Sequence, residues 1–250
     1  MKQVASRDAI LRINKESNWI EEADLSFEVN ESDGYALEEG LRLKEKHGGE
    51  VIVCSMGPQR VKSVIKDALA RGADRAIHVV TDNLTALSPY SAANVLAEAV
   101  RAEQPDLIMT GLQSDDNGYA QTGVIMAELL GLSHATIVIE VDASGEKLRV
   151  KRELESGWYQ WYSMQTPALL TIQSGISQIR YASLKGIMAA KKKEIKEVTA
   201  PDVISRPSHQ RIEKIYFPEK TKQTQFLGDG NAKAGAIALA EKLRTEARVI

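Results

Sequence analysis

Two adjacent carboxylates and a Gln-Thr-Gly triplet stand close together near the middle of the sequence. Asp115 and Asp116 follow the apolar run "LIMTG", and Gln121-Thr122-Gly123 comes shortly after them. Such residues serve four purposes in proteins: a metal site, an acid–base pair, a loop that binds a nucleotide phosphate, or an ordinary turn.

The first two purposes fit the residues poorly. Hard cations take about six or more oxygen ligands, and no further acids stand at the alternating positions of a calcium loop. Acid–base catalysis needs two carboxylates in different environments that face one substrate, whereas neighbouring side chains usually point apart. With four scattered histidines and a single cysteine, Cys54, we expect no metal site.

The nucleotide loop and the plain turn both remain open on the residues alone. Asn117-Gly118 is a turn signal. A helix that begins near Gln121 would offer free backbone amides to a phosphate. The Thr122 hydroxyl would help, and Gly123 would permit a close approach. Neither a Walker-type lysine motif nor GxGxxG is present.

Composition excludes several functional classes. The chain has 250 residues, of which 43% are hydrophobic and 26% charged, as in a globular domain with a substantial core. The net charge of −2 gives no electrostatic case for nucleic acid binding. Apolar runs stay well short of the roughly 18 residues of a membrane span. The polar start, "MKQVASRDAI", predicts no signal peptide, so we expect the cytoplasm.

Strand-like and helical patterns alternate along the first half of the chain, and this alternation predicts an α/β fold. Short apolar strands next to amphipathic helices indicate a parallel sheet that is covered on both faces. The expected strands are 50–56, 75–80, 105–111 and 135–141, and the expected helices are 61–69, 121–130 and one from Pro89. Ligands bind such sheets at the carboxyl ends of the strands. The loops 30–34, 54–58 and 111–123 would line that edge.

The second half differs in pattern and predicts an antiparallel extension and a C-terminal arm. Successive antiparallel strands are expected over 146–154, 158–164 and 168–173, with a final helix over 231–247. We therefore expect a domain over 1–198 and an arm over 199–250. The arm either wraps another subunit or folds back on its own domain.

The start of the chain lacks an expected element. Open parallel sheets usually begin with an apolar strand, but residues 1–9 contain no such run. Either the sheet begins at residue 50 or its first strand is missing.

Five segments in order resemble the β-subunit of electron transfer flavoprotein. They are 33–58, 68–79, 111–131, 150–173 and 179–195. The most specific combination is the QTG loop, the hairpin after it and the segment "RYASLKGIMAAKKK". The resemblance covers about residues 2–200. It implies a three-layer, Rossmann-like adenine-nucleotide-binding domain of the HUP type.

The resemblance also implies a function. Members of this family are heterodimers with an α-subunit that holds most of the FAD. The β-subunit carries a structural AMP, or a second FAD in bifurcating relatives. Electrons pass from acyl-CoA-type dehydrogenases, as in fatty acid oxidation, to a membrane quinone oxidoreductase, and the β-subunit is not itself an enzyme. The QTG triplet favours AMP, although Ala120 is closer to the bifurcating type.

Site residues follow from the resemblance by position. The nucleotide pocket would be lined by Asn30, Glu31, Ser32, Asp33, Met56, Ser114, Asp115, Asp116, Asn117, Gly118, Tyr119, Ala120, Gln121, Thr122, Gly123, Val124 and Ile125. The phosphate would fall to Asn117, Gln121, Thr122 and Gly123. A partner-recognition loop over about 179–195 would use Leu184 as its apolar anchor. Lys191, Lys192 and Lys193 would attract an acidic partner.

A protein of another class could use the same kind of sheet. A universal-stress-type nucleotide-binding protein would bind ATP as a homodimer, and an adenylating enzyme would use a related fold. Their glycine-rich phosphate motifs are absent from this sequence.

Overall fold

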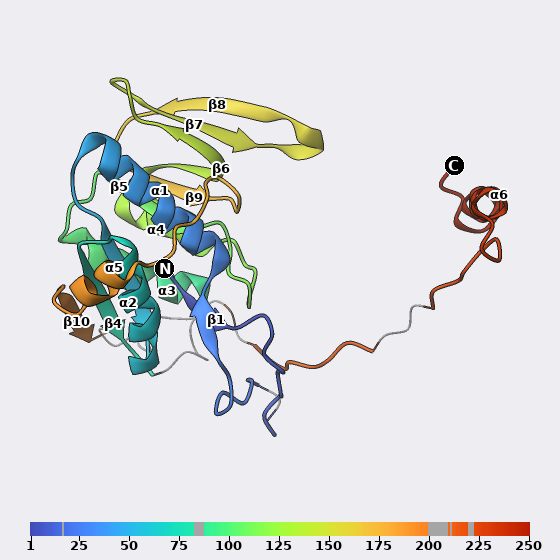
Figure 1. Ribbon diagram of the computed structural model, residues 1–250, viewed down its shortest axis with the longest axis horizontal. Coiled ribbons are helices and arrows are strands. Elements are labelled where there is room, and N and C mark those ends of the chain that lie inside the picture. Colours follow the sequence, from blue (N-terminus) through green and yellow to red (C-terminus); the bar gives the residue numbers. More distant parts are fainter. Residues whose placement is uncertain (17, 83–87, 200–209, 211, 220–222) are drawn as a thin grey trace. The chain divides into compact units, whose positions relative to one another are not determined.

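The structure is a computed structural model of the chain, and it describes all residues except 17, 83–87, 200–209, 211 and 220–222 (Figure 1). The chain divides into two units, Met1–Ile215 and Tyr216–Ile250. The boundary expected at 198/199 falls just before the undescribed residues 200–209.

Unit Met1–Ile215 is an α/β domain, as the sequence predicts, with two sheets that contain its parallel strands. One sheet has the order β10-β4-β3 and is entirely parallel. The other has the order β5-β9-β6-β7-β8 and is mixed. The strands are β3 (Ile52–Gly57), β4 (Arg75–Val80), β5 (Leu107–Gly111), β6 (Ser133–Asp142), β7 (Leu148–Glu153), β8 (Tyr159–Met164), β9 (Ala168–Ile172) and β10 (Ile195–Thr199).

Helices cover both faces of these sheets (Figure 1). They are α1 (Glu31–His47), α2 (Lys62–Arg71), α3 (Pro89–Arg101), α4 (Thr122–Leu130) and α5 (Leu184–Ala190), with 3₁₀ turns η1 (Gln59–Val61) and η2 (Glu155–Gly157). Neighbouring residues of β4 show the two faces, because side chains alternate along a strand. Ala76 packs with α2, whereas Ile77 packs with Val95 of α3. The fold is therefore three-layered.

The two sheets are not joined through β3 and β5. Each of these strands has one partner strand in the described part of the chain. The amine of Met1 donates to the carbonyl of Cys54 at 2.9 Å, and the amide of Lys2 donates to Asp33 at 3.0 Å. The first residues thus link β3 to the start of α1. They then enter β1 (Gln3–Ala5), which among the described strands pairs with β2 (Phe27–Val29) alone, antiparallel. Whether the sheet begins at residue 50 or lacks a first strand stays a prediction.

Two local expectations are wrong. The strand expected over 168–173 as a further antiparallel strand is β9, which lies parallel to and between β5 and β6. Leu169, Leu170 and Ile172 are fully buried because both faces of a central strand are covered. The loop expected over 30–34 is the start of α1, which begins at Glu31.

Unit Tyr216–Ile250 contains α6 (Ala232–Lys242), followed by a π-helical turn, Leu243–Ala247. Together they account for the helix expected over 231–247. Asn231 caps α6, because its side chain accepts from the amides of Lys233 and Ala234. The role of this unit as an arm stays a prediction.

Candidate functional site

The loop after β5 is fastened to the start of α1. Asn30 is 1% exposed, and its side-chain oxygen accepts from the amide of Asp115 at 2.8 Å. Its side-chain nitrogen donates to the carbonyl of Gln113 at 2.9 Å. The Asp115 carboxylate in turn accepts from the amide of Glu31 at 3.1 Å. A negative charge at this end complements the helix dipole, so Asp115 acts as the cap of α1.

Asp33 ties the first turn of α1 to the end of β5. One carboxylate oxygen accepts from the amide of Gly111 at 2.8 Å, and the other accepts from the amide of Lys2 at 3.0 Å and from Asn30 at 3.0 Å. A Cβ at Gly111 would overlap the Ser32 side chain. Glycine is therefore needed here for the close approach of α1 to β5.

Asp116 is paired with Lys2. The Lys2 ammonium donates to Asp116 at 2.6 Å and to the Ser114 hydroxyl at 3.2 Å, and the amide of Asn117 donates to Asp116 at 2.7 Å. Burial acts to raise the pKa of Asp116, but the Lys2 charge and the hydrogen bonds outweigh it, and the pKa is lowered. Both central carboxylates therefore have structural partners. Within the described ranges, no group of three potential metal-ligating side chains occurs.

The N-cap side chains of α1 and α4 both make no cap hydrogen bond, but at α1 the Asp115 carboxylate accepts from the first amide. Gln121 occupies the N-cap position, and its side chain makes no cap hydrogen bond. Gly118 and Ala120 have positive φ values of 61° and 53°. Residues 115–121 are exposed. Uncapped amides at a helix start are suited to an anionic group, and the Thr122 hydroxyl lies in the same turn.

Gly123 has a packing role that the sequence did not reveal. A Cβ at this position would lie 2.5 Å from the Thr110 hydroxyl and 2.9 Å from a methyl carbon of Thr171. The glycine thus allows α4 to lie against β5 and β9. The sequence suggested instead that it makes room for a phosphate.

The structure brings some, but not all, of the predicted pocket residues together. Residues 30–33 and 113–116 are joined by the hydrogen bonds above, and residues 117–125 continue from them into α4. Met56 packs in the apolar cluster of Ile77, Val79 and Val95, on the α3 face. Sequence reasoning missed Lys2 and Gly111, whose partners are distant in the chain.

The predicted recognition segment contains α5, and its apolar surface is larger than expected. Leu184 is 83% exposed, and Tyr181, Ile187 and Met188 are exposed as well. Residues 184, 187 and 188 have the i, i+3, i+4 spacing of one helix face. That spacing is visible in "LKGIMAA" and would have found the additional residues.

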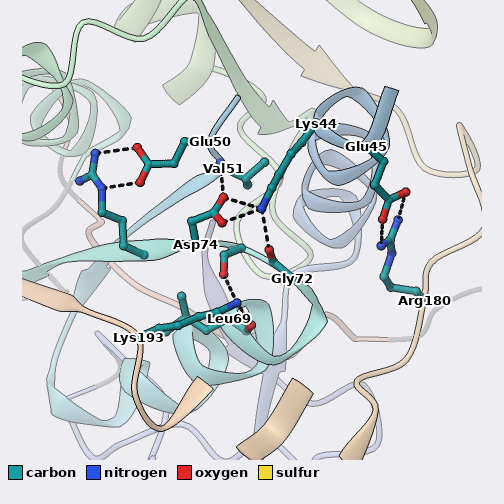
Figure 2. Close-up of polar contacts among 11 residues, drawn as sticks. Lys44, Glu45, Glu50, Val51, Leu69, Gly72, Asp74, Arg180 and Lys193 are labelled. Carbon is teal, nitrogen blue, oxygen red and sulfur yellow. Dashed lines mark hydrogen bonds and ion pairs between the residues drawn. The ribbon is translucent and has the colours of Figure 1, made fainter. Parts of the chain in front are cut away.

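The three predicted lysines are not equivalent. Lys191 and Lys192 are exposed, whereas Lys193 is half-buried. The Lys193 ammonium donates to the carbonyls of Leu69 at 2.9 Å and Ala73 at 2.5 Å (Figure 2). This ammonium is engaged within the protein, so Lys191 and Lys192 are the lysines available to a partner.

The fold and the site define a Rossmann-like α/β protein with an exposed loop between β5 and α4 and an exposed apolar face on α5. Its residues 17–203 match the family model described as the electron transfer flavoprotein domain. The chain belongs to the electron transfer flavoprotein β-subunit family.

Curated relatives extend over most of the chain. It is 36% identical to "Electron transfer flavoprotein subunit beta" of Methylophilus methylotrophus over 248 residues, 95% of this chain and 94% of the relative. It is 41% identical to the protein of that name from Thermoanaerobacterium thermosaccharolyticum, over 70% of this chain and 67% of the relative. The mitochondrial protein of Oryza sativa subsp. japonica is 32% identical, over 100% and 98%. None of the helices in the described ranges is long and apolar enough to span a membrane.

Proposed function

We propose that this chain is the β-subunit of a heterodimeric electron carrier and catalyses no bond-forming or bond-breaking step of its own. The observation that carries the proposal is its similarity to curated β-subunits along nearly the whole of both chains. An α-subunit would hold most of the FAD, and the β-subunit would shape the flavin surroundings from its side. We place the complex in the cytoplasm.

The nucleotide of this subunit is AMP, bound at the start of α4. Two observations support the site: the first turn of α4 has no side-chain cap, and Gly118 and Ala120 shape an exposed loop before it. The start of α1 is a poorer phosphate site because the Asp115 carboxylate already accepts from its first amide, that of Glu31, and would repel an anion there. The phosphate would be held by Gln121, Thr122 and the following amides.

A second FAD at the same place is the alternative. It is favoured by Ala120, which resembles the bifurcating type, and it would make the loop a redox site. The two cofactors share an adenosine and a phosphate, so the same uncapped turn suits both.

The partners are proposed to meet the apolar face of α5. Electrons would arrive from acyl-CoA-type dehydrogenases and leave to a membrane quinone oxidoreductase. Leu184 would enter a pocket of the partner, and Lys191 and Lys192 would attract acidic groups around that pocket. A small contact suits rapid exchange of electrons between proteins.

Cofactor content tests the proposal directly. The chain is purified together with its α-subunit, the complex is denatured, and released FAD and AMP are quantified by chromatography. One FAD and one AMP per heterodimer are expected. Two FAD and no AMP would replace the structural nucleotide with a working flavin. A homodimer that binds ATP and no flavin would contradict the carrier and favour a universal-stress-type protein.

A further inference from the structure

The helix α5 is too short to be stable as an isolated helix. It has seven residues, whereas isolated helices shorter than about 12–15 residues are marginal in water. Its exposed side chains Leu184, Ile187 and Met188 gain little burial in this chain. The conformation and place of α5 must therefore come from contacts that its other residues and its flanks make.

One such contact is the close packing of α5 on the end of α2. Ala190 is buried in the same apolar cluster as Leu69 and Ala70. A Cβ at Gly186 would overlap the carbonyl oxygen of Ala70. The Ser183 hydroxyl caps α5 by accepting from the amide of Gly186 at 3.0 Å. A side chain at position 186 would therefore push α5 away from α2.

Lys193 fixes the segment after α5. Its ammonium binds the carbonyls of Leu69 and Ala73, at the carboxyl end of α2, where unpaired carbonyls and the helix dipole favour a cation (Figure 2). Burial lowers the pKa of Lys193, and nearby Asp74 opposes that shift. Asp74 is itself held by Lys44 at 2.6 and 2.7 Å.

Arg180 fixes the segment before α5. Its backbone amide donates to Glu38 at 3.0 Å, and its guanidinium binds both oxygens of the same carboxylate at 2.9 to 3.1 Å. Glu38 lies on α1 and is 4% exposed. The guanidinium also pairs with Glu45, which lies about two turns further along α1 (Figure 2). The hydrogen bonds to both carboxylates raise the pKa of Arg180.

We propose that Arg180, Gly186 and Lys193 are positioning residues for electron exchange, which hold α5 in its docking conformation before a partner arrives. This inference rests on the proposed function, in which α5 meets the dehydrogenase. A surface that is already ordered loses less conformational freedom on binding, so affinity is retained from a small contact. These residues act through the placement of Leu184 and its neighbours and do not need to touch the partner.

The first test compares Lys193→Met with Lys192→Met in the complete αβ complex. The two variants remove the same charge from adjacent positions, one engaged and one exposed. Lys193→Met is expected to raise KM for the dehydrogenase about tenfold at unchanged kcat, at both low and high salt. Lys192→Met should raise KM less, and its effect should fade at high salt because exposed charges are screened. Lys193→Arg, which keeps the cation, should restore most of the affinity.

The second test changes no charge. Gly186→Ala should raise KM to a similar extent, because it displaces α5 from Ala70. Gly40→Ala is its matched control, since a Cβ at Gly40 of α1 meets nothing within 4 Å. Amide hydrogen exchange over 184–190 should quicken in Lys193→Met and Gly186→Ala and stay unchanged in both controls.

The outcomes separate the inference from the function on which it rests. If Leu184→Ala raises KM while Lys193→Met and Gly186→Ala leave KM and exchange unchanged, docking stands and the positioning role is overturned. If the flavin-loaded wild-type complex accepts no electrons from any dehydrogenase, the proposed function fails and takes the inference with it. Gel filtration and the flavin spectrum check that each variant retains the αβ complex.

Discussion

The loop 113–121 and the segment 180–193 are both proposed to bind something, and they are built with opposite charges. In the loop, the carboxylates Asp115 and Asp116 accept from the start of α1 and from Lys2. The groups that remain for a ligand are the backbone amides at the start of α4, which have no side-chain cap. In the segment, the cations Arg180 and Lys193 donate to α1 and α2. The groups that remain for a partner are the exposed apolar side chains of α5 and the exposed Lys191 and Lys192.

This difference teaches that the conspicuous charges of a segment need not be its binding groups. The carboxylates of the loop lie beside a site proposed for a phosphate, which they would repel if they faced it. Lys193 belongs to a lysine triplet, but its ammonium is bound to carbonyls. In both regions the charged side chains hold the backbone in place, and the groups that stay exposed determine what can bind.

The largest expected effect comes from removing the hydrogen bonds of Asp33, which hold the start of α1 against the end of β5. Asp33→Ala removes the acceptor of the Gly111 and Lys2 amides and of the Asn30 side chain. Unpaired buried donors are costly, so we expect a loss of about 3 kcal/mol in the free energy of unfolding and loss of the nucleotide. Urea denaturation of the complex measures the free energy of unfolding, and chromatography measures the nucleotide content. Asp116→Ala is the control, and an equal loss there would contradict the special role of Asp33.

A smaller effect is expected where α4 meets the sheet. Gly123→Ala places a methyl group against Thr110 and Thr171, so overpacking should destabilise the protein by about 1–3 kcal/mol. If Gly123 serves only the phosphate, stability would be unchanged and AMP content alone would fall. Gly131→Ala is a poor control because of its positive φ of 69°. Gly40→Ala, in an open helical position, is the better one.

Leu184→Ala tests the docking role of the segment 180–193 and leaves the contacts of Arg180 and Lys193 in place. Truncation of a central apolar contact should cost about 1–2 kcal/mol of partner binding, which is seen as a higher KM for the dehydrogenase. The flavin spectrum, AMP content and stability of the complex should not change, because Leu184 is exposed. An unaltered rate at saturating and at subsaturating partner would remove the docking role.

The smallest effect concerns the pH dependence of stability and compares Asp116 of the loop with Asp74, the carboxylate near Lys193. Burial acts to raise the pKa of Asp74, but the hydrogen bonds from Lys44 and the amide of Val51 outweigh it, and the pKa is lowered. The pKa of Asp116 is lowered as well. A folded-state pKa below the ordinary 3.8 gives stability that is present above about pH 4 and is lost as the pH falls further.

Each partly exposed pair should contribute less than about 1 kcal/mol. Urea denaturation between pH 6 and pH 3 should show a shallower acid loss in Asp74→Asn and in Asp116→Asn than in the wild type. Asp24→Asn, at an exposed carboxylate, serves as the charge control. A wild-type slope in both variants would show that these ions do not stabilise the folded protein.

Patterns of local origin were predictable from the sequence. The apolar spacing of Val64, Ile65, Ala68 and Leu69 predicted α2, and all four side chains are buried. The strand 75–80 coincides with β4. The strand β9 was placed correctly along the chain but given the wrong neighbours, because an apolar run does not state which strands flank it.

What the sequence by itself determined is the alternation of strands and helices, the α/β class and the family. These follow from periodicity, turn residues and ordered segments, all of which act along the chain. Only the tertiary structure decided that Asp115 caps α1, that Lys2 holds Asp116, and that Lys193 binds the end of α2. These partners are separated by 84, 114 and 124 residues. Their hydrogen bonds exist only because the folded sheet brings distant helix ends and loops within reach.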